Sequence, residues 1–312
     1  MTDQAAFQAD LPGAEAALRR ELARGDAVGA AALPVLRHLV AAEETALLSE
    51  EVLARVRGML ADVASQVLDG LIGDTDRGMH APDDVGLLTR TFLQDERLLQ
   101  HVHALALEWQ LTETLQESMA LDPVSPPLLQ RLLQDEQLGE PARRFLKSQA
   151  QWCQAQRRMA LPLAELPLNV LQSAIESLRK LVGADAALSA RVSDVEARVR
   201  RIRTEVSGRL DLALLLCDGL KRRDQVLSVC EAGLALFCSG LSRFSDQPRD
   251  VLVVSIHPGR STRLALALLA AGASHRMVET QLLVLTPRAQ LPSGLDGIDA
   301  GRAAALLTAG VR

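Results

Sequence analysis

The stretch DDVGLLTRTFLQDERL at residues 83–98 has a counterpart in PVSPPLLQRLLQDEQL at residues 123–138. The letters LQDE coincide, at 93–96 and again at 133–136. In each copy a short segment with helical apolar spacing runs into LQD, and a longer segment with the same spacing follows. Acidic residues or a Ser-Pro pair stand where each short segment begins, which suits a helix start. Both copies therefore predict a short helix, a tight turn and a longer helix.

The similarity extends beyond the four identical letters. Leu88 aligns with Leu128, and each longer segment contains a tryptophan, Trp109 or Trp152. A period of about 40 residues is typical of HEAT-like and armadillo-like arrays, so we expect a HEAT-like repeat pair. The alternative is chance similarity between two helices rich in Leu and Gln. Because two copies cannot form a solenoid alone, neighbouring helices must cover their outer faces. The expected repeat pair occupies residues 83–120 and 123–160.

The rest of the chain also has the composition of helices, since Ala, Leu, Arg, Glu and Gln dominate it. The segment VLVVSI near residue 251 is rich in β-branched residues, but it lies between Pro248 and Pro258 without a second strand to pair with, so we favour a helix. The sequence predicts an all-α, multi-helical fold. We expect an N-terminal helical domain at 1–183, and a long helix with a C-terminal helical subdomain at 184–312. Expected helices lie near 13–24, 27–42, 50–72, 185–218, 222–241 and 248–256, after Ser261, after Ser274 and from Ala300.

Composition argues against several classes of protein. A net charge of −5 and a pI near 5.7 disfavour a nucleic-acid binder, which needs a basic face. Aromatic residues make up 2% of the chain and tyrosine is absent, so base stacking is disfavoured as well. No apolar run is long enough to cross a bilayer. The 4 cysteines form no CxxC pair, and the chain starts without a signal peptide, so we expect reduced thiols and a cytoplasmic location.

A seam of apolar residues marks the expected long helix. Its positions alternate spacings of four and three, as in a coiled coil, and it ends at Arg209, which falls on the next d position. The seam packs either against another helix of the same chain or against a second copy, as a homodimer through residues 188–206. The seam consists of Leu188, Val192, Val195, Val199, Ile202 and Val206.

Two basic stretches are candidate contacts for a protein partner. Arg198 and Arg201 lie in an arginine-rich stripe on the long helix, where nearby carboxylates can also pair with them as an ordinary solvated face. Arg143 and Arg144 precede Trp152 in ARRFLKSQAQW, which is a basic patch with aromatics or a core stripe. These five residues are the predicted partner-binding set.

No recognisable catalytic or metal-binding motif is present. His101 and His103 are two apart, so on a helix they point in different directions and cannot share a metal as an i, i+4 pair could. The DTDRG stretch at 74–78 resembles the start of a calcium loop, but Met79 and Val85 occupy the positions that need Gly and Glu. We therefore predict no catalytic residue, no metal and no cofactor.

The run PRDVLVVSIHPGRSTRLALALLAAGASHRMVETQLLVL at 248–285 resembles the end of a bacterial family of all-helical, HEAT-like proteins of unknown function. The resembling features are the residues 248–251, the alternating Leu/Ala helix, and Ala271-Gly272 followed by a Ser cap. These are helix caps and core positions, so the resemblance carries over no catalytic residue. By analogy it implies an interaction role.

Together these observations predict a non-catalytic scaffold or adaptor that binds another protein in a helical groove. One alternative is an enzyme with an unfamiliar all-helical active site, which a deep pocket with convergent carboxylate and histidine side chains would favour. Another is a nucleic-acid-binding regulator, which a continuous face of unpaired arginines would favour.

Replacing Val199 with Asp distinguishes the two interpretations of the seam. Burial of this side chain contributes about 1.5–3 kcal/mol, and an unpaired charge in its place destabilises further. If the seam packs within one chain, the variant unfolds or aggregates. If the seam joins two chains, the variant becomes a folded monomer with half the mass by light scattering. Unchanged stability and mass would contradict both interpretations, because the stripe would then face solvent.

Overall fold

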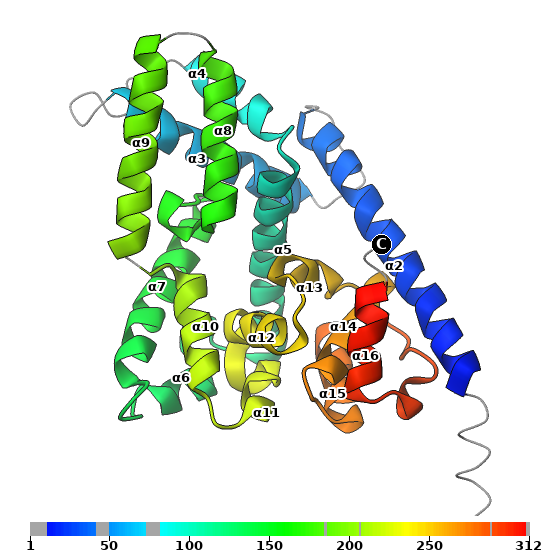
Figure 1. Ribbon diagram of the computed structural model, residues 1–312. Coiled ribbons are helices and arrows are strands. Elements are labelled where there is room, and N and C mark those ends of the chain that lie inside the picture. The colour runs from blue at the N-terminus through cyan, green and yellow to red at the C-terminus, as the bar shows by residue number, and fades with distance from the viewer. Residues whose placement is uncertain are drawn as a thin grey trace, which may run out of the picture. The chain divides into compact units, whose positions relative to one another are not determined.

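The computed structural model describes residues 11–41, 50–72, 82–183, 186–205, 207–287 and 289–309. Within these ranges the chain is helical and contains no strand, so the predicted all-α class is confirmed (Figure 1). None of the described helices combines the length and apolar character needed to cross a bilayer. The helices are α2 (Leu11–Ala41), α3 (Glu50–Ile72), α4 (Pro82–Phe92), α5 (Glu96–Met119), α6 (Pro127–Leu132), α7 (Gly139–Arg157), α8 (Leu168–Val182), α9 (Ala186–Glu205), α10 (Arg209–Gly219), α11 (Arg223–Val226), α12 (Val229–Ser245), α13 (Arg249–Ser255), α14 (Ser261–Ala270), α15 (His275–Leu285) and α16 (Ala300–Ala309), with short 3-10 turns η1 (Leu163–Glu165), η2 (Pro258–Arg260) and η3 (Leu295–Gly297).

The chain forms two compact units, each assembled from segments that are distant in sequence. The first unit comprises Met1–Ala32, Gln116–Ala142 and Ala213–Arg312, and the second comprises Leu33–Leu115 and Arg143–Leu212. Whether residues 184–312 fold apart from residues 1–183 stays a prediction of the sequence.

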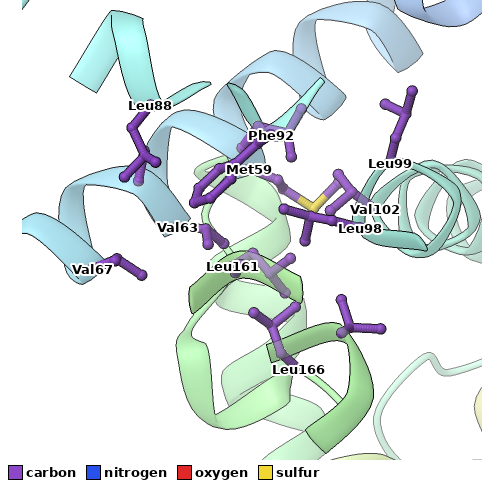
Figure 2. Close-up of a cluster of buried hydrophobic side chains, with 14 of the residues drawn as sticks. Met59, Val63, Val67, Leu88, Phe92, Leu98, Leu99, Val102, Leu161 and Leu166 are labelled. Carbon is purple, nitrogen blue, oxygen red and sulfur yellow. The ribbon is translucent and has the colours of Figure 1, made fainter. Parts of the chain in front are cut away.

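The second unit has a continuous apolar core. Side chains of α3, α4 and α5 meet those of α8, α9 and the segment around η1 (Figure 2). Val56, Met59, Val63 and Val67 of α3 are all 0% exposed, so the apolar stripe expected along this helix faces the core. Each such side chain contributes about 1.5–3 kcal/mol when it leaves water, and aliphatic residues carry most of this core.

The apolar seam of α9 packs within this unit. Val192 and Val195 are buried in the core, and Val199 is partly buried against it. Helix α9 lies beside α8 and α3 (Figure 1), and a Cβ on Gly70 of α3 would come within 3.1 Å of Val195. The side chains of Ile202 and Val206 lie outside the described residues. Packing against α3 and α8 accounts for the described part of the seam, and a homodimer through 188–206 stays a prediction.

The structure differs from the expected long helix at 185–218. Helix α9 ends at Glu205 and α10 begins at Arg209, with Ser207 and Gly208 outside both helices. The carboxylate of Asp211 accepts a hydrogen bond from the Gly208 amide at 3.0 Å, so it satisfies a donor at the start of α10. Gly208 lowers the local helix propensity, and the Asp211 cap favours a new start over continuation.

Two further expectations about helix limits were wrong. The predicted helix at 222–241 is divided into α11 and α12, while the predicted pair at 13–24 and 27–42 is the single helix α2. Gly25 and Gly29 of α2 do not end the helix. They allow Arg260 to approach, since a Cβ on Gly29 would lie 2.6 Å from the Arg260 guanidinium carbon. Arg263 completes this contact within the first unit, with its Nη2 2.6 Å from a carboxylate oxygen of Asp26.

The C-terminal segment follows the sequence closely. Residues 249–255 form helix α13 rather than a strand, as Pro248 and the lack of a second strand suggested. Ser274 caps α15 by accepting a hydrogen bond from the Met277 amide at 3.3 Å, and α16 begins at Ala300. Helix α14 packs against α15 and α16.

Both LQDE segments form the same local structure. A short helix, α4 or α6, ends at the motif, and a long helix, α5 or α7, follows. In the first copy the amide of Asp95 donates to the Phe92 carbonyl, and in the second the amide of Asp135 donates to the Leu132 carbonyl. The aspartate carboxylates then accept hydrogen bonds from backbone amides of the next turn. Asp95 accepts from Leu98, and Asp135 accepts from Leu138. The helix–turn–helix expected at both places is therefore present, while a HEAT-like array is not shown.

Replacing Asp95 with Ala tests this turn. The variant loses the acceptor for the Leu98 amide, 3.0 Å from the carboxylate, so we expect a loss of about 1 kcal/mol in unfolding free energy. Chemical denaturation measures it, with the exposed Glu117 changed to Ala as a control that stays within about 0.5 kcal/mol. Equal stability of the two variants would mean that this cap does not hold the turn.

Candidate functional site

The sequence-predicted partner residues lie on α7 and α9 in the second unit. Arg143, Arg144 and Arg201 are exposed and Arg198 is half-buried. Trp152 is only 1% exposed, so its side chain belongs to the core rather than to a basic surface patch. That these four arginines bind a partner stays a prediction.

Trp152 instead takes part in a buried charged cluster around Arg209. The Arg209 guanidinium lies 4.1 Å from the centre of the Trp152 ring, in cation–π geometry. It donates to the carboxylate of Glu108, at 2.9 Å and 3.4 Å, and to the amide oxygen of Gln149 at 3.2 Å. Glu165 of η1 lies 3.5 Å from its Nε. Arg209 is 1% exposed and Glu108 is 0% exposed, so solvent does not screen this pair.

A second arginine extends this cluster. The Arg55 guanidinium lies 5.3 Å from the Trp109 ring, and the Trp109 and Trp152 rings meet edge to face at 5.7 Å. Arg55 donates to the backbone carbonyl of Gln156 and pairs with Glu51 at 2.9 Å. Buried ring edges and guanidinium groups thus fix α5 against α7. Because Arg55, Arg209, Glu108 and both tryptophans are buried, we interpret the cluster as structural.

His101, His103 and Cys217 are buried side chains. His101 and His103 are 1% and 5% exposed, and burial lowers the pKa of His103 to about 4, so this ring is uncharged at neutral pH. Burial raises the pKa of the Cys217 thiol to about 12, which makes it a poor nucleophile. Among the residues that the structure describes, no group of His, Cys, Asp and Glu side chains could hold a metal ion. The DTDRG stretch lies outside those residues.

A groove beside the second LQDE segment is the candidate site in the first unit. Its volume is about 570 Å³, within the range of ligand-binding clefts. We call the leucines of the lining its floor and the two charged pairs its walls: Asp135 and Glu136 follow α6, while Lys221 and Arg222 follow α10. The lining residues are Leu128, Arg131, Leu132, Gln134, Asp135, Glu136, Gln137, Leu138, Gly219, Leu220, Lys221, Arg222 and Gln225.

The charges of the groove are only partly paired within the chain. Arg131 pairs with Glu231, and Arg222 pairs with Asp224, each at 2.6 Å. The amides of Leu138 and Gln137 donate to the Asp135 carboxylate and lower its pKa, and the charge of Lys221 acts in the same direction. Glu136 and Lys221 are exposed. Asp135 therefore stays ionised, and Glu136 and Lys221 can meet a bound molecule.

The chemistry of this groove favours binding. Its lining contains carboxylates, amides and cations but no hydroxyl, thiol or imidazole. Covering the leucine floor with apolar groups is favourable, because it removes apolar surface from water. The charged walls select the orientation and the charge of the bound molecule.

Comparisons of the chain with protein-family models, with curated proteins and with solved structures find no match. The resemblance of residues 248–285 to a HEAT-like family has no support from these comparisons, and the all-helical class is the part of it that holds.

Sequence reasoning missed both the groove and the buried cluster. The signal for the cluster was Arg209, a charged residue at the d position that ends an apolar seam. The signal for the groove was weaker. Leu138 corresponds to the buried Leu98 in the offset alignment but is itself only half-buried, and a sequence alone does not give that difference.

Replacing Arg209 with Met leaves the buried Glu108 without its cation and should lower the unfolding free energy by about 3–5 kcal/mol. Adding Glu108→Gln removes the stranded charge, so part of the loss returns. Thermal and chemical unfolding measure both variants, with exposed Arg201→Met as the matched control. A loss for Arg209→Met no greater than for the control would contradict a stabilising role for the cluster.

Proposed function

We propose that this protein is a non-catalytic interaction scaffold that holds a segment of another protein in the groove beside residues 133–138. The observation that carries the proposal is the lining of the groove, which combines leucines, two of them half-buried, with an acidic pair and a basic pair. Binding surfaces of proteins commonly combine an apolar centre with a polar rim in this way. The free energy of binding comes from covering the leucines, and the charges specify the partner.

The two alternatives from the sequence are less well supported by this geometry. An enzyme with an all-helical active site would be favoured by convergent histidine and carboxylate groups in a pocket, whereas this groove lacks an imidazole and His101 and His103 are buried. A nucleic-acid-binding regulator would be favoured by a continuous basic face. Here Asp135 and Glu136 face the bound molecule, and their charges repel phosphates.

The proposed scaffold works in the cytoplasm with its cysteines reduced. Cys153, Cys217, Cys230 and Cys238 are all free thiols in the structure. The exposed arginines of α7 and α9 are further candidate contacts for the same partner or for another acidic one. Their contribution is separable, because they belong to the second unit and the groove belongs to the first.

A photo-crosslinking residue at Gln137 tests this function inside the host cell. Gln137 is exposed and lines the groove, so a bound protein should form a discrete adduct of defined mass. The same crosslinker at Thr280, exposed on α15 of the same unit, is the control. We expect the adduct only from Gln137, and we expect it to disappear when Leu138 is changed to Asp, because a charge on the floor opposes apolar burial. Equal labelling from both positions, or none, would contradict a docking role for the groove.

A further inference from the structure

The two LQDE segments allow one surface to be compared with its own counterpart. The backbone hydrogen bonds around the turns correspond one to one at an offset of forty residues. The amides of Leu93, Gln94, Asp95 and Leu99 donate to the carbonyls of Thr89, Thr91, Phe92 and Asp95, and those of Leu133, Gln134, Asp135 and Gly139 donate to the carbonyls of Leu129, Arg131, Leu132 and Asp135. Leu128, Leu132 and Leu138 therefore occupy the local positions of Leu88, Phe92 and Leu98.

In the first copy these three positions are covered by helices. Leu88, Phe92 and Leu98 are each 0% exposed. Helix α4 packs against α3 and α8. Figure 2 shows the three side chains gathered with Met59, Val63 and Val67, which line one face of α3. The natural cover of this surface is thus an amphipathic α-helix.

In the second copy the corresponding surface is covered in part: Leu128 and Leu132 are 1% and 6% exposed, and only Leu138 is half-buried. Helix α6 packs against α12, where Gly233 has a φ of 70° and a Cβ would come within 2.9 Å of the Pro126 ring. On its other side, Leu128, Leu132 and Leu138 line the 570 Å³ groove. Leu138 is half-buried, whereas its counterpart Leu98 is fully covered. Helix α12 lies beside α6, and the end of α10 lies beside Leu138, since a Cβ on Gly219 would come within 2.5 Å of that side chain.

The charges of the groove agree with a helical occupant. The lining combines leucines with an acidic pair, Asp135 and Glu136, and a basic pair, Lys221 and Arg222. A helix with an apolar stripe can present cations along one edge of the stripe and anions along the other. Helix α3 has charges of both signs around its stripe, for example at Arg55, Arg57 and Asp62.

We infer that the occupant of the groove is an amphipathic α-helix of a partner protein, with apolar residues spaced three and four apart as in α3. This inference rests on the proposed scaffold function and specifies the class of its partner. The helix lies with its apolar stripe on the half-buried leucines of the lining, Leu138 and Leu220. Its basic edge meets Glu136, and its acidic edge meets Lys221.

A fluorescent peptide with the sequence of residues 50–72 is the probe, because this segment covers the equivalent surface in the first copy. Fluorescence anisotropy with the full-length protein should show saturable binding. Changing Leu138 to Asp should weaken binding at least about tenfold, and so should changing the peptide residue corresponding to Val63 to Asp. Lys221→Glu, on an exposed side chain, should weaken binding and change its salt dependence, since it reverses one wall.

The matched control is Arg276→Glu, which changes an exposed charge on α15 away from the groove. It should leave the affinity unchanged, and circular dichroism should show that every variant keeps its helix content. No saturable binding, or binding that Leu138→Asp leaves intact, would overturn the inference, because the peptide would then be taking the place of α3 or binding elsewhere. If the Gln137 crosslink forms while the peptide fails to bind, the scaffold function stands and the helical partner is wrong. Loss of both results overturns both proposals.

Discussion

An apolar helix face must be covered, and this requirement governs both copies of the LQDE turn. The turn itself is held by backbone hydrogen bonds and by an aspartate that caps the next helix, so it forms whatever lies next to it. What it presents is a set of leucine-sized side chains that lose free energy when they face water. In the first copy α3 and α8 cover them. In the second copy Leu128 and Leu132 are buried, with α12 packed against α6, while Leu138 stays half-buried and lines a groove.

Buried charged groups define the packing of a core that has few aromatic residues. The chain has 2 tryptophans and no tyrosine, so aliphatic side chains of similar shape fill most of the interior. Such cores favour burial but discriminate weakly between alternative packings. The contact of Arg209 with Glu108 and Trp152, and in the other unit that of Arg263 with Asp26, have defined geometries. A misplaced helix would leave one of these charges buried and unpaired, which costs several kcal/mol.

Periodicity and capping residues were enough to predict the helical class and many helix limits. The helix at 50–72, the helix after Pro248 and the Ser274 cap depend on local sequence, and all three were predicted. The errors came from tertiary contacts. A break was expected between residues 24 and 27, but in the structure Gly25 and Gly29 make room for Arg260 within one helix, and the break after Glu205 is followed by the Asp211 cap. The groove was missed for the same reason, because it too depends on tertiary contacts. Leu98 and Leu138 have the same sequence context, and the helices that pack around each of them decide how far they are buried.

Hydrogen–deuterium exchange of the full-length protein tests the central claim most directly, since it locates the covered surface without any substitution. On addition of the peptide with the sequence of residues 50–72, we predict slower exchange of the amides in 128–138 and 219–225, which line the groove, and no change in 88–98. Slower exchange away from the groove, altered exchange in 88–98, or no change at all would contradict the claim that the second LQDE turn presents an open site for a helix.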